Sequence, residues 1–219
     1  MADEVAAAAA DEIWIDSLVT IWYRPRATIR QIVDTDPRKL VLGIAWLAGA
    51  LGVLNSQVML ATIDLPPRVP HLPRLGSIGI AIAAFICGAL GVAILYGFGA
   101  LFRWAGDILG GTATAVEVRA ALAWAQVPGL YLAVVMIFAA AFGLYAPLAT
   151  AAAFPAGLIR SIFGIWLFVI LLKCLGEVHR FSAWRALSAM LLGFFAVFAV
   201  AAGIVITIWL AVLVSHFVV

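Results

Sequence analysis

The stretch ALSAMLLGFFAVFAVAAGIVITIWLAVLVS, residues Ala186–Ser215, contains 30 consecutive residues and no charged side chain. As a helix it would be about 45 Å long, which exceeds the ~30 Å hydrocarbon core of a bilayer. The stretch therefore predicts a membrane-spanning helix that tilts or protrudes from the bilayer.

Four earlier stretches have the same apolar character, and each is near or above the length that a membrane-spanning helix needs. They are Leu40–Ile63, Leu75–Phe102, Ala120–Phe142 and roughly Gly157–Leu175. Hydrophobic residues make up 66% of the 219-residue chain, and no stretch is typical of a β-strand. We therefore predict an all-α polytopic membrane protein with five transmembrane helices and no soluble domain.

The distribution of Lys and Arg predicts the orientation, because cytoplasmic loops carry an excess of these residues. With the N-terminus placed in the cytoplasm, ten of the 13 basic residues lie inside and three lie outside. The inside set is Arg24, Arg26, Arg30, Arg38, Lys39, Arg103, Arg119, Lys173, Arg180 and Arg185, and the outside set is Arg68, Arg74 and Arg160. We therefore expect the N-terminus inside and the C-terminus outside.

Residues 1–36 are expected to form a cytoplasmic N-terminal segment, and residues 37–219 the five-helix transmembrane domain. Within Asp11–Tyr23, apolar residues recur at three- and four-residue spacing, which is typical of an amphipathic helix lying in the membrane interface. Pro25 is placed to begin a second short helix, whose basic residues are expected to face lipid phosphates. These residues are Arg24, Arg26 and Arg30. We favour an anchor over a dedicated partner-binding site.

Three short motifs predict where helices begin. Asp36-Pro37 has the pattern of an N-cap followed by proline at the first helical position, so the first span is expected to start there. Thr114 and Glu117 have the spacing of a capping box, which gives Glu117 a structural role that we favour over a functional one. Ser182 is positioned to cap the fifth span.

Polar side chains inside the apolar stretches are the first group of candidate site residues. Trp124, Gln126 and Pro128 lie together in the third span, where Pro128 removes a backbone donor, frees the carbonyl of Trp124 and bends the helix. Such a kink can build a membrane cavity or simply bend a helix around its neighbours, and both interpretations stay open. Asn55 and Gln57 add polar groups toward the outer end of the first span.

Ionisable residues around the fourth span are the second group. Lys173 and Arg160 are expected to extend toward opposite interfaces. Lys173 has Glu177 one helical turn away, and it would be a functional candidate if it pointed inward. Glu177, His179 and Arg180 gather in one short segment, which is more typical of a solvated turn than of an acid–base site.

Several chemistries lack the residues that they need. Cys87 and Cys174 lie in apolar stretches without metal-ligand spacing, so we expect small packing residues. The three histidines lie outside the spans and do not form a haem-ligand pair. No protease or phosphate-loop motif occurs, and a net charge of +2 does not indicate nucleic-acid binding. We therefore predict no cofactor, no metal, no nucleic-acid partner and no enzymatic activity.

Three motifs carry a family resemblance. They are PRATIRQI at Pro25–Ile32, Gly110-Gly111-Thr112 followed by the alanine-rich Ala120–Pro128, and Glu177-Val-His179-x-Phe181-Ser182-x-Trp184-Arg185-Ala186. From about Pro25 to the fifth span, the chain resembles the Yip1 family of integral membrane proteins. The resemblance implies five spans with a cytoplasmic N-terminus. Eukaryotic members are associated with vesicle traffic and Rab-type GTPases, but the short hydrophilic segment Met1–Arg38 argues against a GTPase-docking role here.

We predict a non-enzymatic integral membrane protein that binds a membrane partner, protein or lipid, and assists membrane processes in a bacterial inner membrane. Ala84 and Gly88 have the small-xxx-small spacing of close helix contacts, so we expect a membrane-protein partner or a homo-oligomer as well as membrane lipids. The alternative is a small transporter, channel or lipid translocator with a polar path near Pro128. A less favoured third interpretation is an enzyme that acts on lipid headgroups through Glu177 and His179.

Overall fold

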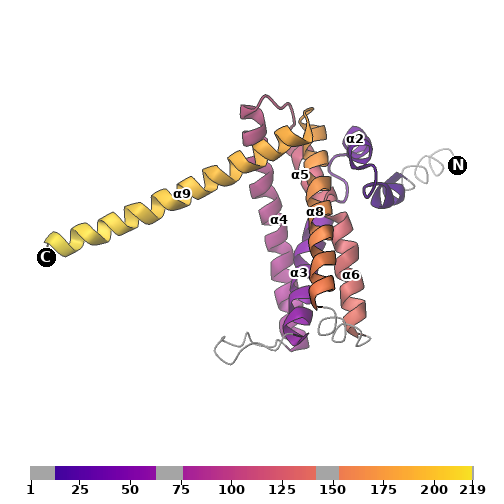
Figure 1. Ribbon diagram of the computed structural model, residues 1–219, viewed down its shortest axis with the longest axis horizontal. Helices are drawn as coiled ribbons and strands as arrows, with labels where there is room; N and C mark the ends of the chain where they lie inside the picture. The colour runs from indigo at the N-terminus through magenta and orange to yellow at the C-terminus, as the bar shows by residue number, and fades with distance from the viewer. Residues whose placement is uncertain (1–12, 63–75, 142–152, 219) are drawn as a thin grey trace.

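The computed structural model describes residues 13–62, 76–141 and 153–218, and within these ranges every regular element is a helix (Figure 1). The helices are α2 (Pro25–Thr35), α3 (Val41–Thr62), α4 (Ser77–Ile108), α5 (Ala115–Trp124), α6 (Val127–Ala141), α8 (Ala153–Val178) and α9 (Ala183–Val218). Residues 13–20 form a further short helix. The all-α prediction is confirmed.

Among the described residues, four helical stretches are long and apolar enough to cross a membrane. They are Ser77–Ile108, Ala115–Ala139, Ser161–Val178 and Ala183–Leu210, and Val41–Ser56 is a shorter apolar helix. The chain is therefore a membrane protein by the length and composition of its helices. The count of five spans and their orientation remain predictions.

Helices α3, α4, α6 and α8 run alongside one another as a bundle, whereas α9 leaves the bundle after its first turns (Figure 1). Near its start, α9 contacts α4 through Phe194, whose ring centroid lies 5.7 Å from that of Phe102. Farther along, Phe198 and Trp209 are exposed. At about 54 Å this helix is much longer than the hydrocarbon core, and its apolar surface suits contact with lipid.

The ends of α4 and α8 and the starts of α5 and α9 meet beside α2 at one end of the bundle, which we call the α2 end (Figure 1). Helix α2 has proline in its first turn, as predicted, and it buries Ile29 and Ile32. Its apolar side packs on α8 and α5. The α2 end is therefore the part of the molecule where sequence-distant segments converge.

The N-terminal helix packs against the bundle with its apolar side. Trp14 and Ile21 are buried, and the ring centroid of Trp14 lies 6.1 Å from that of Trp124 in a stacked arrangement. Trp22 contacts Tyr131 of α6, at 5.9 Å between centroids. A helix is therefore present within the stretch 11–23, and Trp14 and Trp22 pack on the bundle. The position of this segment in the membrane interface remains a prediction.

The predicted helix starts have different outcomes. The start at Asp36-Pro37 is wrong, because Asp36 ends α2 and its Oδ1 accepts a hydrogen bond from the backbone N–H of Arg38, so α3 begins only at Val41. The capping box is confirmed by hydrogen bonds in both directions between Thr114 and Glu117. The cap at Ser182 is confirmed by its Oγ, which accepts from the backbone N–H of Arg185.

Glycines allow α3 and α4 to approach closely. A Cβ at Gly91 would lie 2.6 Å from the backbone oxygen of Ala45, and a Cβ at Gly88 would lie 2.5 Å from the ring of Trp46. Gly88 therefore lies in a close helix contact, as its spacing predicts, but this contact lies within one chain and not between two molecules. Gly97, on the same helix α4, faces open space.

We predict that Gly91→Ala lowers stability by about 1–3 kcal/mol, because the backbone oxygen of Ala45 cannot move away without separating the two helices. Gly97→Ala is the matched control, and the higher helix propensity of alanine should leave stability equal or slightly raised. Thermal unfolding in detergent, followed by tryptophan fluorescence, measures both. Equal midpoints for the two variants would contradict the close contact between α3 and α4.

Candidate functional site

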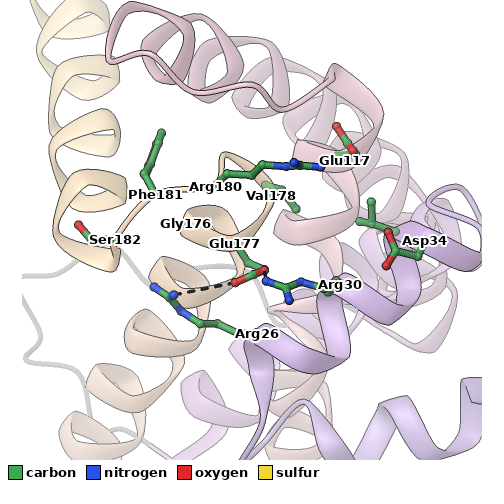
Figure 2. A pocket seen from close by; sticks show the side chains of 11 residues that line it. Arg26, Arg30, Asp34, Glu117, Gly176, Glu177, Val178, Arg180, Phe181 and Ser182 are labelled. Atoms are coloured by element: carbon green, nitrogen blue, oxygen red, sulfur yellow. Dashed lines mark hydrogen bonds and ion pairs between the residues drawn. The ribbon is translucent and has the colours of Figure 1, made fainter.

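An open polar cavity of about 800 Å³ lies at the α2 end, between α2, the first turn of α5 and the turn that joins α8 to α9 (Figure 2). Its lining combines three arginines, three carboxylates and a smaller number of apolar or small residues. The lining residues are Arg26, Arg30, Val33, Asp34, Glu117, Gly176, Glu177, Val178, Arg180, Phe181 and Ser182.

Glu177 of α8 lies between two arginines of α2 (Figure 2). Its carboxylate pairs with Arg30, and its Oε2 lies 3.9 Å from Nη1 of Arg26. The side chain of Glu177 is 11% exposed, whereas those of Arg26 and Arg30 are 46% and 68% exposed. Arg26 and Arg30 are four residues apart and therefore share one face of α2. This pairing attaches α2 to the end of α8.

The remaining charges of the cavity are less fully paired. Among the described residues, neither Arg180 nor Asp34 forms an ion pair or a side-chain hydrogen bond, and both line the cavity. Oε2 of Glu117 accepts a hydrogen bond from the backbone N–H of Thr114, at 2.6 Å. In Figure 2 the Arg180 side chain extends toward Glu117, while Asp34 lies on α2 beyond Arg30.

The C-terminal ends of α4 and α8 close in the same way, with different residues. At α8, the N–H of Phe181 bonds the oxygen of Gly176 at 2.9 Å, and that of Arg180 bonds the oxygen of Glu177 at 3.1 Å. Both bonds are typical of a Schellman motif, which places its C′ residue in the left-handed region. Gly110 has this conformation at α4 with φ +78°, and Arg180 has it at α8 with φ +59°.

His179 is buried behind the cavity, with 1% of its surface exposed. Its ring stacks on Phe181 at 5.0 Å between centroids and fills the space that a Cβ at Gly106 or Gly111 would occupy. Neither ring nitrogen makes a hydrogen bond of good geometry to a described residue, although the backbone of Phe102 is close enough to favour the protonated ring. The prediction of a solvated turn is therefore wrong for His179, which packs the α4–α5 turn against the end of α8.

The third span breaks where Pro128 predicts. Helix α5 ends at Trp124 and α6 begins at Val127. The N–H of Gln126 bonds the oxygen of Ala123, and the side-chain Nε2 of Gln126 then donates to the oxygen of Leu122 at 3.1 Å. The Gln126 side chain thus repairs the break. Trp124 and Pro128 are buried. Gln126 lines two grooves beside the break, and neither groove is lined by Trp124 or Pro128.

Gln126 also lines a largely apolar groove of about 440 Å³ between α3, α6 and α8, together with Asn55. The structure thus brings together two of the predicted polar residues. It does not bring Lys173 to them or pair it with Glu177, because Nζ of Lys173 lies over the Trp166 ring at 5.9 Å from the centroid. The side chains of Gln57 and Arg160 lie outside the described residues.

The described part of the chain contains no metal-binding group of side chains and no disulfide. No group of three or more His, Cys, Asp or Glu side chains there could hold a metal ion. Cys87 and Cys174 are free thiols, and Cys174 is buried beside the backbone oxygen of Pro25 at 3.8 Å. Cys174 is part of the buried core, as predicted, whereas Cys87 is only half-buried.

Sequence reasoning named Glu177 but missed the residues that surround it in the cavity. Arg26 and Arg30 were expected to face lipid phosphates, Arg180 to belong to a solvated turn, and for Glu117 a capping role was favoured over a functional one. The four-residue spacing of Arg26 and Arg30 does predict that they share one face of a helix. No local signal connects that face to Glu177, which lies 147 residues after Arg30.

One comparison with known proteins identifies the family of the chain. A family model described as the Yip1 domain matches residues 19–205. This range is most of the chain, so the protein belongs to the Yip1 family. It includes α2, the first turn of α5 and the turn from α8 to α9, which together build the cavity. No curated protein and no solved structure matches the chain.

We predict that acid destabilises the protein through His179. Burial lowers the pKa of His179 below its ordinary value of 6.5, although the charge of Asp107, the backbone of Phe102 and the charge of Glu117 act in the opposite direction. Below that pH the unfolded chain binds a proton that the folded chain does not, so stability falls as the pH falls, by at most about 1.4 kcal/mol per pH unit. His179→Phe should remove this component.

The unfolding midpoint between pH 7.5 and pH 5, compared for wild type and His179→Phe, tests this prediction. His216→Gln is the control, because this histidine lies near the far end of α9. A wild-type midpoint that falls no faster with acid than that of His179→Phe would contradict the buried, neutral histidine.

Proposed function

We propose that this Yip1-family membrane protein is non-enzymatic and binds another membrane component, a lipid or a protein segment, in the polar cavity at the α2 end. The observation that carries the proposal is Glu177, which Arg26 and Arg30 share inside an open cavity. One carboxylate cannot neutralise two guanidinium groups. This group of three side chains therefore keeps one positive charge, which an anionic group of a partner can bind.

The depth of the cavity favours a membrane component. Glu117 lies near the start of the candidate span Ala115–Ala139, and Glu177 lies at the end of the candidate span Ser161–Val178. Where two spans end, the bilayer changes from hydrocarbon to headgroups. A ligand at that level is a lipid headgroup or a juxtamembrane segment of another protein.

The position of His179 argues against an enzyme at the same place. An acid–base pair of Glu177 and His179 would need both groups to reach one substrate. Glu177 lines the cavity, but His179 is buried between glycines and stacked on Phe181. The headgroup-modifying enzyme that the sequence left open is therefore not supported by this geometry.

Contact with membrane lipids follows from the apolar exposed surface of α9 and needs no special site. A homo-oligomer or a membrane-protein partner remains proposed, and the glycine contacts between α3 and α4 no longer argue for it because they are used within the chain. The bacterial inner membrane, expected from the sequence, remains the proposed location.

The second candidate function is a small translocator, and the observation that favours it is the groove shared by Asn55 and Gln126. The other residues that line this groove are apolar or small, and Lys173 is not among them. A charged substrate would therefore meet little compensation along it. Equal lipid scrambling in vesicles by wild type and Gln126→Leu would count against this candidate.

A photoreactive benzophenone amino acid placed at Val33 tests the proposed function. We expect a crosslinked product from the native membrane, because Val33 is partly exposed and lines the cavity, and its replacement leaves every charge of the lining in place. The same amino acid at Gln31 is the matched control, because Gln31 is exposed on α2 but does not line the cavity. Mass spectrometry of the product distinguishes a lipid from a protein.

A product of defined mass at position 33 and none at position 31 supports binding in the cavity. Products of equal yield at both positions, or no product at either, would overturn it, because the cavity would then be no different from the rest of the surface of α2.

A further inference from the structure

We propose that the ligand of this cavity is the headgroup of a zwitterionic phospholipid that carries a primary ammonium, as phosphatidylethanolamine does. The inference rests on the proposed function and names the chemical class of its ligand. It follows from the order of the charges along α2, the strained position of Arg180 and the depth of the cavity.

The phosphate would bind at Arg26 and Arg30. A guanidinium group presents several N–H donors in a planar fork that matches phosphate oxygens, and each of these side chains is only partly buried. Glu177 occupies part of this donor set and leaves a net positive charge on the pair. A phosphate monoanion placed beside the pair would balance that charge.

The ammonium would bind at Asp34. Arg26, Arg30 and Asp34 follow one another at four-residue intervals, so they form a row along one face of α2 that lines the cavity. Four residues rise by about 6 Å, which is comparable with the span of an ethanolamine group between phosphate and ammonium. Asp34 has no ion pair among the described residues, and a primary ammonium offers three N–H donors.

Arg180 supplies a further cation at a conformational cost. The left-handed region favours glycine, and the equivalent position at the end of α4 is Gly110. At α8 the position holds an arginine whose side chain extends along the cavity (Figure 2). A strained residue of this kind indicates a role for its side chain, and here that role is a second contact to the phosphate or glycerol oxygens.

The apolar part of the lining favours a lipid over a soluble zwitterion. Val33, Val178 and Phe181 line the same cavity as the charges, and Val178 is the last residue of α8. They place apolar surface where the glycerol and the first acyl carbons of a lipid would lie. A free headgroup would gain nothing from this contact.

The balance of charge separates this ligand from other phospholipids. Three arginines face three carboxylates in the lining, so the cavity carries no net charge that would select an anionic lipid. Phosphatidylglycerol has no cation for Asp34. Phosphatidylcholine has a quaternary ammonium, which donates no N–H hydrogen bond. A primary ammonium meets both requirements.

The test uses the full chain in nanodiscs that contain phosphatidylethanolamine, phosphatidylglycerol and phosphatidylcholine in equal amounts. Native mass spectrometry of the released protein identifies the lipids that stay bound. We expect phosphatidylethanolamine to be enriched on the order of tenfold, which is the ratio that one charged hydrogen bond supplies. Asp34→Asn should abolish the preference for phosphatidylethanolamine over phosphatidylcholine.

Two further variants separate binding from folding. Arg180→Gly removes the guanidinium and relieves the left-handed backbone, so we expect lower lipid retention together with unchanged or higher thermal stability. Arg103→Gln is the control, because Arg103 lies outside the cavity lining and pairs with Asp107 at 3.7 Å. It should retain lipid as the wild type does.

Equal retention of the three lipids, or a preference for phosphatidylglycerol, would overturn the inference, and a crosslink at position 33 would still support the proposed function. A crosslink to a protein alone would likewise overturn the lipid inference and support the proposed function. Displacement of the bound lipid by an equimolar amount of water-soluble glycerophosphoethanolamine would overturn a lipid as the source of the headgroup. Loss of the position-specific crosslink would overturn both proposals.

Discussion

The constraint on which the rest of this structure depends is that a backbone in hydrocarbon has no water to bond, so its polar groups must be paired within the chain. Helices satisfy this rule along their length and leave it unsatisfied at their ends. At the α2 end, the chain closes these ends with its own groups. Thr114 and Glu117 cap α5, Ser182 caps α9, and Schellman-type bonds close α4 and α8.

The gathering of helix ends also explains where the charges lie. A guanidinium or carboxylate group is tolerated where spans end and is costly in the middle of the bilayer. At the α2 end, the C-terminal end of α8 and the start of α5 contact α2. Arg30 and Glu177 can therefore pair there. The cavity is therefore a direct consequence of where the spans begin and end.

The helices and most of their caps could be predicted from sequence because the information is local. An apolar run predicts a span, and Thr-x-x-Glu predicts a capping box, since both depend on residues within a few turns. Asp36-Pro37 failed because two helices compete for one short segment. Asp36 ends α2, its side chain bonds the N–H of Arg38, and Leu40 takes a left-handed conformation before α3 begins.

The site was largely beyond prediction because its contacts are distant in sequence. For Glu177 the local rule favoured Lys173, one turn away, but tertiary packing supplies Arg30 from the other end of the chain. The burial of Trp124 depends on Trp14, and that of His179 depends on Gly106 and Gly111. Each of these side chains is conspicuous in the sequence, but no spacing rule joins it to its partner.

The mixed charge of the cavity determines which ligands it can discriminate. A cavity lined by arginines alone would hold any phosphate, including those of abundant anionic lipids, with little discrimination. Asp34 and Glu117 place negative charge beside the arginines, so an anion without its own cation pays a repulsive cost there. Specificity in such a site comes from the carboxylates as much as from the arginines, because rejection of the wrong ligand requires a group that disfavours it.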